Sequence, residues 1–310
     1  TIESAARAAA PASLLRYVPN TLENRRYLTF GDYAAWLDAW GIERPATLDD
    51  VDVLADAQRE RWLNALTAQT TPPPDVLGLQ YLAAEPMIER YGFDFFSADR
   101  YLQAGELPDL ITAVAGQYDE AAIGDALTAA GYTSAPLAEG VDLYSIRDDY
   151  EIDLESSGAV GRMGELNRIA LADDLLLVTR ATDLAEGAVA AAGSSLADDP
   201  VYQALLASLD APELNDAGAL VGLVMVGEPV LLDVASLILG DSTPEEIRAQ
   251  WEAWTEQDPP LPPYLLAGFA TYRAPDATYL ALAEALGAVL LTSDRRVAEI
   301  PGHEATVEVV

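Results

Sequence analysis

Two hydrophobic periodicities alternate along the chain and predict a mixture of strands and helices. Apolar residues that are continuous or alternate every second position indicate strands, whereas apolar residues three and four apart indicate helices. Strand patterns occur at 27–30, 110–116, 141–146, 168–172, 175–179, 220–226, 265–272 and 289–292. Helix patterns occur at 2–10, 32–40, 47–68, 120–130, 182–192, 199–209, 244–254 and 275–286, and a further helix is expected to begin at a capping Ser97.

The order of these elements predicts the fold class. Between residues 109 and 192 the order is strand, helix, three strands and helix, with short local turns, which is typical of an α+β fold with a mostly antiparallel sheet. This order resembles a ferredoxin-like module, and a looser version returns later in the chain. We expect two ferredoxin-like or related modules side by side, each with helices on one face of its sheet. The N-terminal α+β module, with a helical N-terminal region, would span 1–195, and the C-terminal α+β module 196–310.

The charge of the chain narrows the choice of partner. Its 310 residues contain 51 Asp and Glu against 17 positive residues, all of them arginine, for a formal net charge of -34. Such a surface repels the phosphates of nucleic acids and anionic lipids. We therefore expect no nucleic-acid partner, and a small molecule or a protein of unknown identity in its place.

Residues that carry common enzyme chemistry are missing. The chain has no cysteine and no lysine, and its one histidine is His303 in a Pro-Gly-His-Glu sequence typical of a surface loop. There is no G-x-S-x-G nucleophile motif, no dinucleotide-binding glycine motif and no phosphate-binding loop. The sequence thus offers no catalytic residues and no resident cofactor, which favours a binding or scaffold role over an enzyme.

Two local clusters leave alternatives open. Tyr91, Phe93, Phe95 and Phe96 form an aromatic run that is either a packing hub or one wall of a small-molecule pocket. Because pockets favour domain interfaces, we expect any such pocket at the junction of the two modules. Alternating acids between Asp149 and Glu155 indicate either the solvated face of a strand or a Ca²⁺ loop.

Residues 1–228 resemble uncharacterised bacterial envelope lipoproteins. The resemblance rests on the segments Leu15–Pro19 and Tyr27–Tyr33, on Gly116-Gln117-Tyr118-Asp119 with the later Gly131-Tyr132, and on the apolar hairpin Ile169–Val178. It implies a non-enzymatic, extracytoplasmic binding or scaffold protein of the cell envelope or the secreted fraction. It also implies that the membrane is reached only through an N-terminal anchor that has been removed.

Residues 229–310 resemble a truncated PIN-domain ribonuclease. The similarity lies in Val230–Ser236 and in Asp276–Arg296, and it implies that Asp233, Asp276 and Asp294 hold Mg²⁺ or Mn²⁺ for phosphodiester hydrolysis. Two departures count against activity: Ala267-Gly268 stands where the family has an acid, and the helical middle of the domain is missing before Asp276. A metal-dependent ribonuclease is therefore the alternative function, and we expect the three acids not to converge.

Overall fold

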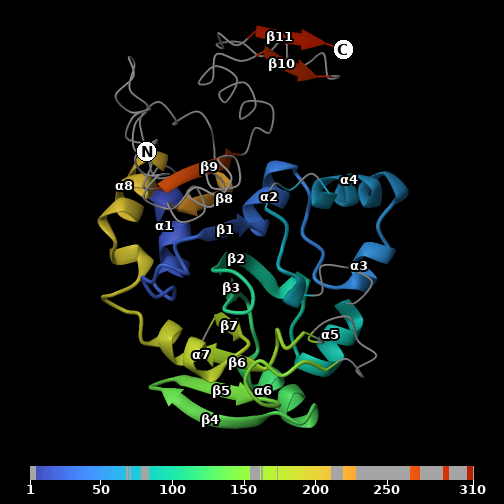
Figure 1. Cartoon of the computed structure of the whole chain (residues 1–310). Coiled ribbons are helices and arrows are strands. Elements are labelled where there is room, and N and C mark those ends of the chain that lie inside the picture. The colour runs from blue at the N-terminus through green and yellow to red at the C-terminus, as the bar shows by residue number, and fades with distance from the viewer. Residues whose placement is uncertain are drawn as a thin grey trace.

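The chain folds around a nine-stranded β-sheet, shown with its helices in the computed structural model of Figure 1. The structure describes residues 5–67, 69, 71–77, 84–153, 161, 163–172, 174–210, 219–227, 266–272, 289–292 and 306–309. The strands are β1 (Tyr27–Asp32), β2 (Ala98–Ala104), β3 (Ile111–Gly116), β4 (Thr133–Ala138), β5 (Val141–Ser145), β6 (Arg168–Ala172), β7 (Leu175–Thr179), β8 (Leu220–Gly227), β9 (Leu266–Tyr272), β10 (Val289–Thr292) and β11 (Thr306–Val309). The helices are α1 (Ala5–Leu15), α2 (Tyr33–Ala39), α3 (Leu48–Asp52), α4 (Asp56–Thr67), α5 (Ala84–Tyr91), α6 (Glu120–Ala129), α7 (Thr182–Val189) and α8 (Pro200–Leu209), with 3-10 turns η1 (Asp75–Leu77), η3 (Phe95–Ser97) and η4 (Leu196–Asp198).

The strand order is β4-β5-β6-β7-β3-β2-β1-β8-β9, and every neighbouring pair is antiparallel. The predicted α+β class with a mostly antiparallel sheet is therefore confirmed. The β6–β7 hairpin follows its predicted bounds and pairs Ala172 with Leu175 across the turn. Strands β10 and β11 form a separate parallel pair.

The sheet runs across the boundary expected near residue 195. Strand β8 lies beyond that boundary, yet it pairs with β1 over five residues, including Phe30 opposite Leu223, and β9 then pairs with β8. The strands before and after residue 195 thus share one sheet, and an arrangement of two ferredoxin-like modules is not confirmed. Strand pairing across the boundary was invisible in the sequence because the order of elements does not say which edge a later strand joins.

Helices cover both faces of the sheet, and the expectation of helices on one face only was wrong. Figure 1 shows α1, α7 and α8 on one side of the sheet and α2, α4, α5 and α6 on the other. Alternate residues of each central strand enter two separate cores: in β7, Leu177 faces the α1 side while Leu176 and Val178 face the α2 side. Strands buried on both faces are apolar throughout, so their sequences hide the alternation that would reveal two faces.

Two local predictions fail for identifiable reasons. The helix expected after Ser97 is strand β2, because Asp94 and Ser97 form a capping box around the short turn η3, which ends at Ser97. The helix expected over 47–68 is divided into α3 and α4. Arg59 of α4 donates from Nε to the carbonyl of Val51 (3.3 Å) and also contacts the carbonyl of Asp52, so a side chain satisfies backbone groups at the end of α3.

Candidate functional site

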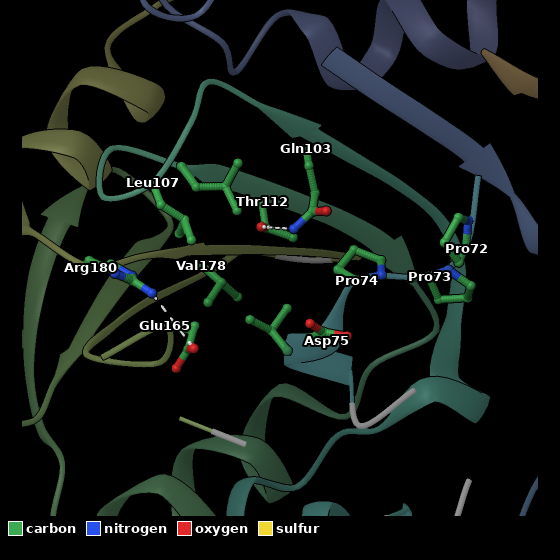
Figure 2. A pocket seen from close by; sticks show the side chains of 12 residues that line it. Pro72, Pro73, Pro74, Asp75, Gln103, Leu107, Thr112, Glu165, Val178 and Arg180 are labelled. Carbon is green, nitrogen blue, oxygen red and sulfur yellow. Dashed lines mark hydrogen bonds and ion pairs between the residues drawn. The ribbon is translucent and has the colours of Figure 1, made fainter. Parts of the chain in front are cut away.

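A pocket of about 310 Å³ lies over the α2-side face of the sheet, where β2, β3 and β7 run side by side (Figure 2). Its size is at the small end of the range for small-molecule sites. It is lined by Pro72, Pro73, Pro74, Asp75, Val76, Gln103, Leu107, Leu110, Thr112, Glu165, Val178 and Arg180.

The floor of the pocket comes from neighbouring strands in fixed register. Gln103 of β2 lies directly opposite Thr112 of β3, and its amide Nε2 donates to the Thr112 hydroxyl over 3.1 Å. Val178 of β7 pairs with Thr112 on the other side. Arg180 continues the alternation of Leu176 and Val178 just past the end of β7, so its side chain comes to the same face. The rigid sheet therefore fixes both the polar and the apolar parts of the floor.

One wall is the triple proline, which is tied to the sheet through a tyrosine. The hydroxyl of buried Tyr101 donates to the carbonyl of Thr71, immediately before Pro72. Burial raises the pKa of Tyr101 far above its ordinary value, so the phenol keeps its proton and stays a donor. The ring passes over its cross-strand neighbour Gly31, where an added Cβ would lie 2.2 Å from the Tyr101 hydroxyl oxygen. Glycine at position 31 therefore makes room for the side chain that holds the pocket wall.

Replacing Tyr101 by phenylalanine tests this link between sheet and wall. The ring would still pack, but the Thr71 carbonyl would lose its donor, and we expect a stability loss of about 1 to 2 kcal/mol. Amide hydrogen exchange should increase over 71–77 while strands β2 and β3 stay protected. Unchanged exchange in that segment, measured at equal global stability, would show that the hydrogen bond does not hold the wall.

The charged side chains of the pocket, Arg180, Glu165 and Asp75, differ in how many protein groups they contact. Arg180 is 9% exposed, and the one contact of its guanidinium among the described residues is an ion pair at 3.7 Å with Glu165. That separation exceeds hydrogen-bond distance. Glu165 itself accepts a hydrogen bond from the backbone N–H of Met163 over 2.9 Å, and Asp75 lies exposed on the proline side of the pocket. A buried guanidinium with so few protein acceptors is an incomplete arrangement, because a buried charge is stable only when hydrogen-bonded.

The turn that carries Glu165 is held by the loop before it. Gly164 has a φ of +80°, and a Cβ there would lie 2.6 Å from the carbonyl oxygen of Glu151. Asn167 donates from Nδ2 to the same carbonyl over 2.8 Å and to that of Asp148 over 3.2 Å. The Tyr150 N–H in turn donates to the backbone carbonyl of Arg180 over 3.0 Å. Loop 146–153 thus positions both members of the Glu165–Arg180 pair.

The acids of this loop do not lie on a strand, which corrects that part of the expectation, and two of them make contacts within the protein. Asp149 accepts hydrogen bonds from the backbone N–H and the hydroxyl of Thr182, at 2.9 and 3.0 Å, and pairs with Arg168. Asp153 pairs with Arg147. Residues 146–153 form no strand. Asp149 and Glu151 are nonetheless exposed to solvent, and the Ca²⁺ loop stays a prediction because Glu155 lies outside the described residues.

The four predicted aromatic residues lie in the core on the α2 side of the sheet. Tyr91, Phe93, Phe95 and Phe96 are at most 5% exposed and pack against one another and against Tyr33 and Trp62. None of them lines the pocket of Figure 2. Their packing role is thus evident, while a pocket walled by these rings stays a prediction.

The predicted metal ligands Asp233, Asp276 and Asp294 lie outside the described residues, as does His303. Within the described ranges, no three His, Asp or Glu side chains come close enough to hold a metal ion. The ribonuclease alternative and its Mg²⁺ or Mn²⁺ therefore stay predictions. In the same part of the chain, none of the helices combines the length and apolar character of a membrane span.

Comparisons with protein-family models, curated proteins and solved structures give no match to this chain. Any function of the pocket therefore has to be inferred from its own geometry and chemistry. Sequence reasoning missed the pocket, although two signals were present. The triple proline at 72–74 is a stiff segment, and Arg180 extends an apolar strand in the phase of its buried residues.

Proposed function

We propose that this protein is a non-enzymatic, extracytoplasmic binding protein whose ligand occupies the pocket over β2, β3 and β7. The observation that carries the proposal is Arg180, a buried cation at the pocket floor whose ion pair with Glu165 is as long as 3.7 Å. Ligand sites are typically apolar hollows with a few convergent polar groups. Val178, Leu110 and the prolines supply the apolar part here, and Gln103, Thr112 and Arg180 supply the polar part.

The chemistry of the lining favours binding over catalysis. A nucleophile needs an adjacent base to be activated. The Thr112 hydroxyl accepts from the Gln103 amide, the chain has no cysteine and no lysine, and no histidine is among the described residues that line the pocket. The extracytoplasmic location rests on the resemblance of residues 1–228 to envelope lipoproteins. Fractionation of cells that produce the protein at its native level tests it, and recovery with cytosolic marker enzymes would contradict it.

Filling the pocket tests the binding function directly. Leu110 lines the pocket, is half-buried and stands just before β3, so its replacement by tryptophan would occupy the cavity with little disturbance of the sheet. We expect ligands found by a ligand-observed NMR screen of small polar molecules to lose their signal on Leu110→Trp, and to be recovered chemically unchanged after incubation. The control is Leu22→Trp, since Leu22 is 69% exposed and is not among the residues that line the pocket. Equal binding by wild type and Leu110→Trp would place any ligand elsewhere, and a chemically altered ligand would overturn the non-enzymatic assignment.

A further inference from the structure

We propose that the ligand is a small zwitterion, with a carboxylate that binds Arg180 and an ammonium group that binds Asp75. This inference rests on the proposed binding function and adds the chemical class of the ligand. It follows from three features of the pocket. These are the buried cation Arg180 with few acceptors, the acid Asp75 on the proline side, and the apolar residues of the lining.

The first feature is Arg180. A guanidinium has five N–H donors arranged to meet a carboxylate through two parallel hydrogen bonds. In the described structure these donors meet only the distant Glu165 carboxylate, whose other oxygen is bound to the Met163 N–H. A ligand carboxylate beside Val178 would supply the missing acceptors without displacing an existing hydrogen bond to Arg180.

The second feature is the acidic side of the pocket. Asp75 begins the turn η1 directly after Pro74, and its carboxylate makes no hydrogen bond or ion pair within the described residues. Figure 2 shows Asp75 on the proline side of the pocket and Arg180 beyond Val178, near Leu107. Among the described residues, the lining carries two acids, Asp75 and Glu165, and one arginine, a net charge of -1. A ligand with a carboxylate alone would leave Asp75 without a partner.

The electrostatic field of the whole protein also favours a zwitterionic ligand. A net charge of -34 repels an anion before it reaches the pocket, whereas a zwitterion has no net charge and escapes this penalty. The apolar part of the lining, which includes Val178, Leu110 and Pro74, suits a short run of methylene groups. A neutral molecule with charged ends and an apolar middle therefore fits the lining better than a simple anion or a simple amine.

The test uses probes that differ only in their end groups. Isothermal titration at low ionic strength would measure wild-type protein with ω-amino acids of three to six carbons, because the series covers different separations of the two ends. For the ω-amino acid that binds best, the plain acid and the plain amine of the same chain length serve as matched probes; for 4-aminobutanoate these are butanoate and butylamine. At least one ω-amino acid should bind, and removal of either end group should weaken binding about tenfold or more.

Two variants assign the two ends. Asp75→Asn should remove the preference for the amino acid over the matched acid, and Arg180→Gln should remove the preference over the matched amine. Asp125→Asn and Arg16→Gln change charge equally at exposed positions away from the pocket and should leave both preferences intact. Asp75 is exposed, so its variant is expected to fold even if Arg180→Gln does not, and the ammonium end stays testable.

The outcomes separate this inference from the binding function. Equal affinity for the ω-amino acid that binds best and for the plain acid of the same chain length, or no binding by any ω-amino acid at millimolar concentration, would overturn the zwitterion. If other small molecules still bind in the screen and are lost on Leu110→Trp, the binding function stands without it. Loss of preference in the two control variants would show that general surface charge, rather than Asp75 and Arg180, sets the selectivity.

Discussion

Replacing Trp62 by alanine is expected to destabilise the protein by about 3 to 5 kcal/mol, the usual cost of removing a large buried aromatic side chain. Trp62 of α4 is fully buried. Its ring lies nearly parallel to that of Phe96, with centroids 6.2 Å apart and planes at 12°, and its indole N–H donates to the Tyr33 hydroxyl over 3.3 Å. Truncation would leave a large cavity between α4, α2 and η3 because three elements cannot collapse onto it together.

Urea unfolding measures this effect, with Trp40→Ala as the matched control. Trp40 is only half-buried and packs at the edge of the same core, so its loss should cost distinctly less. The comparison also bears on the aromatic run 91–96. A loss of about 1 kcal/mol or less for Trp62→Ala would mean that the surrounding rings rearrange to fill the space. That result would contradict a tightly packed aromatic core and would favour an adaptable pocket.

Replacing Arg168 by methionine is expected to cost about 3 kcal/mol, because its buried guanidinium satisfies several backbone groups at once. Arg168 is 6% exposed. Its Nη1 donates to the carbonyls of Ile146, Arg147 and Asn167 at 3.2, 3.1 and 2.8 Å, and its Nε donates to the Thr182 hydroxyl over 2.8 Å. Methionine fills similar space but leaves the carbonyls of Ile146 and Arg147 without this donor, whereas the Asn167 carbonyl still accepts from the Ile146 N–H over 3.0 Å.

The control for this prediction is Asp149→Asn, which removes the charge opposite Arg168. Nη2 of Arg168 lies 2.6 Å from Asp149, but the Asp149 side chain is 42% exposed, so the change should cost about 1 kcal/mol or less. Amide exchange provides a second readout: in Arg168→Met the Tyr150 amide, which donates to Arg180, should lose protection before the strands do. Equal stability losses for the two variants would assign the effect to the ion pair rather than to the carbonyls.

Most helices and strands that were predicted correctly are marked by a sequence pattern only a few residues long. Asp32, Asp119 and Asp199 each cap the helix that follows, and a side-chain oxygen ahead of a helix is recognisable wherever it occurs. The β6–β7 hairpin is likewise a local unit with two apolar runs and a short turn. Strand β4 was missed because its residues are almost all exposed and include Pro136, so no apolar alternation marks it.

The candidate site lay beyond such reasoning because its residues are distant in sequence. Asp75, Gln103, Glu165 and Arg180 come from four separate segments. Their meeting depends on β7 pairing with β3, which follows a connection of almost sixty residues that contains three other strands. Aromatic density pointed instead to the run 91–96, since large rings mark cores and pockets alike.

The sequence by itself determined the α+β class, the antiparallel hairpins, the acidic surface and the lack of cysteine, lysine and common catalytic motifs. These properties are sums over residues or depend on neighbours along the chain. Only the tertiary structure decided that β8 joins β1, that helices cover both faces and that an under-paired Arg180 faces a pocket. Each of these features depends on which strands pair. The pairing is selected by the burial of apolar surface between distant segments, and this burial cannot be evaluated from any one segment alone.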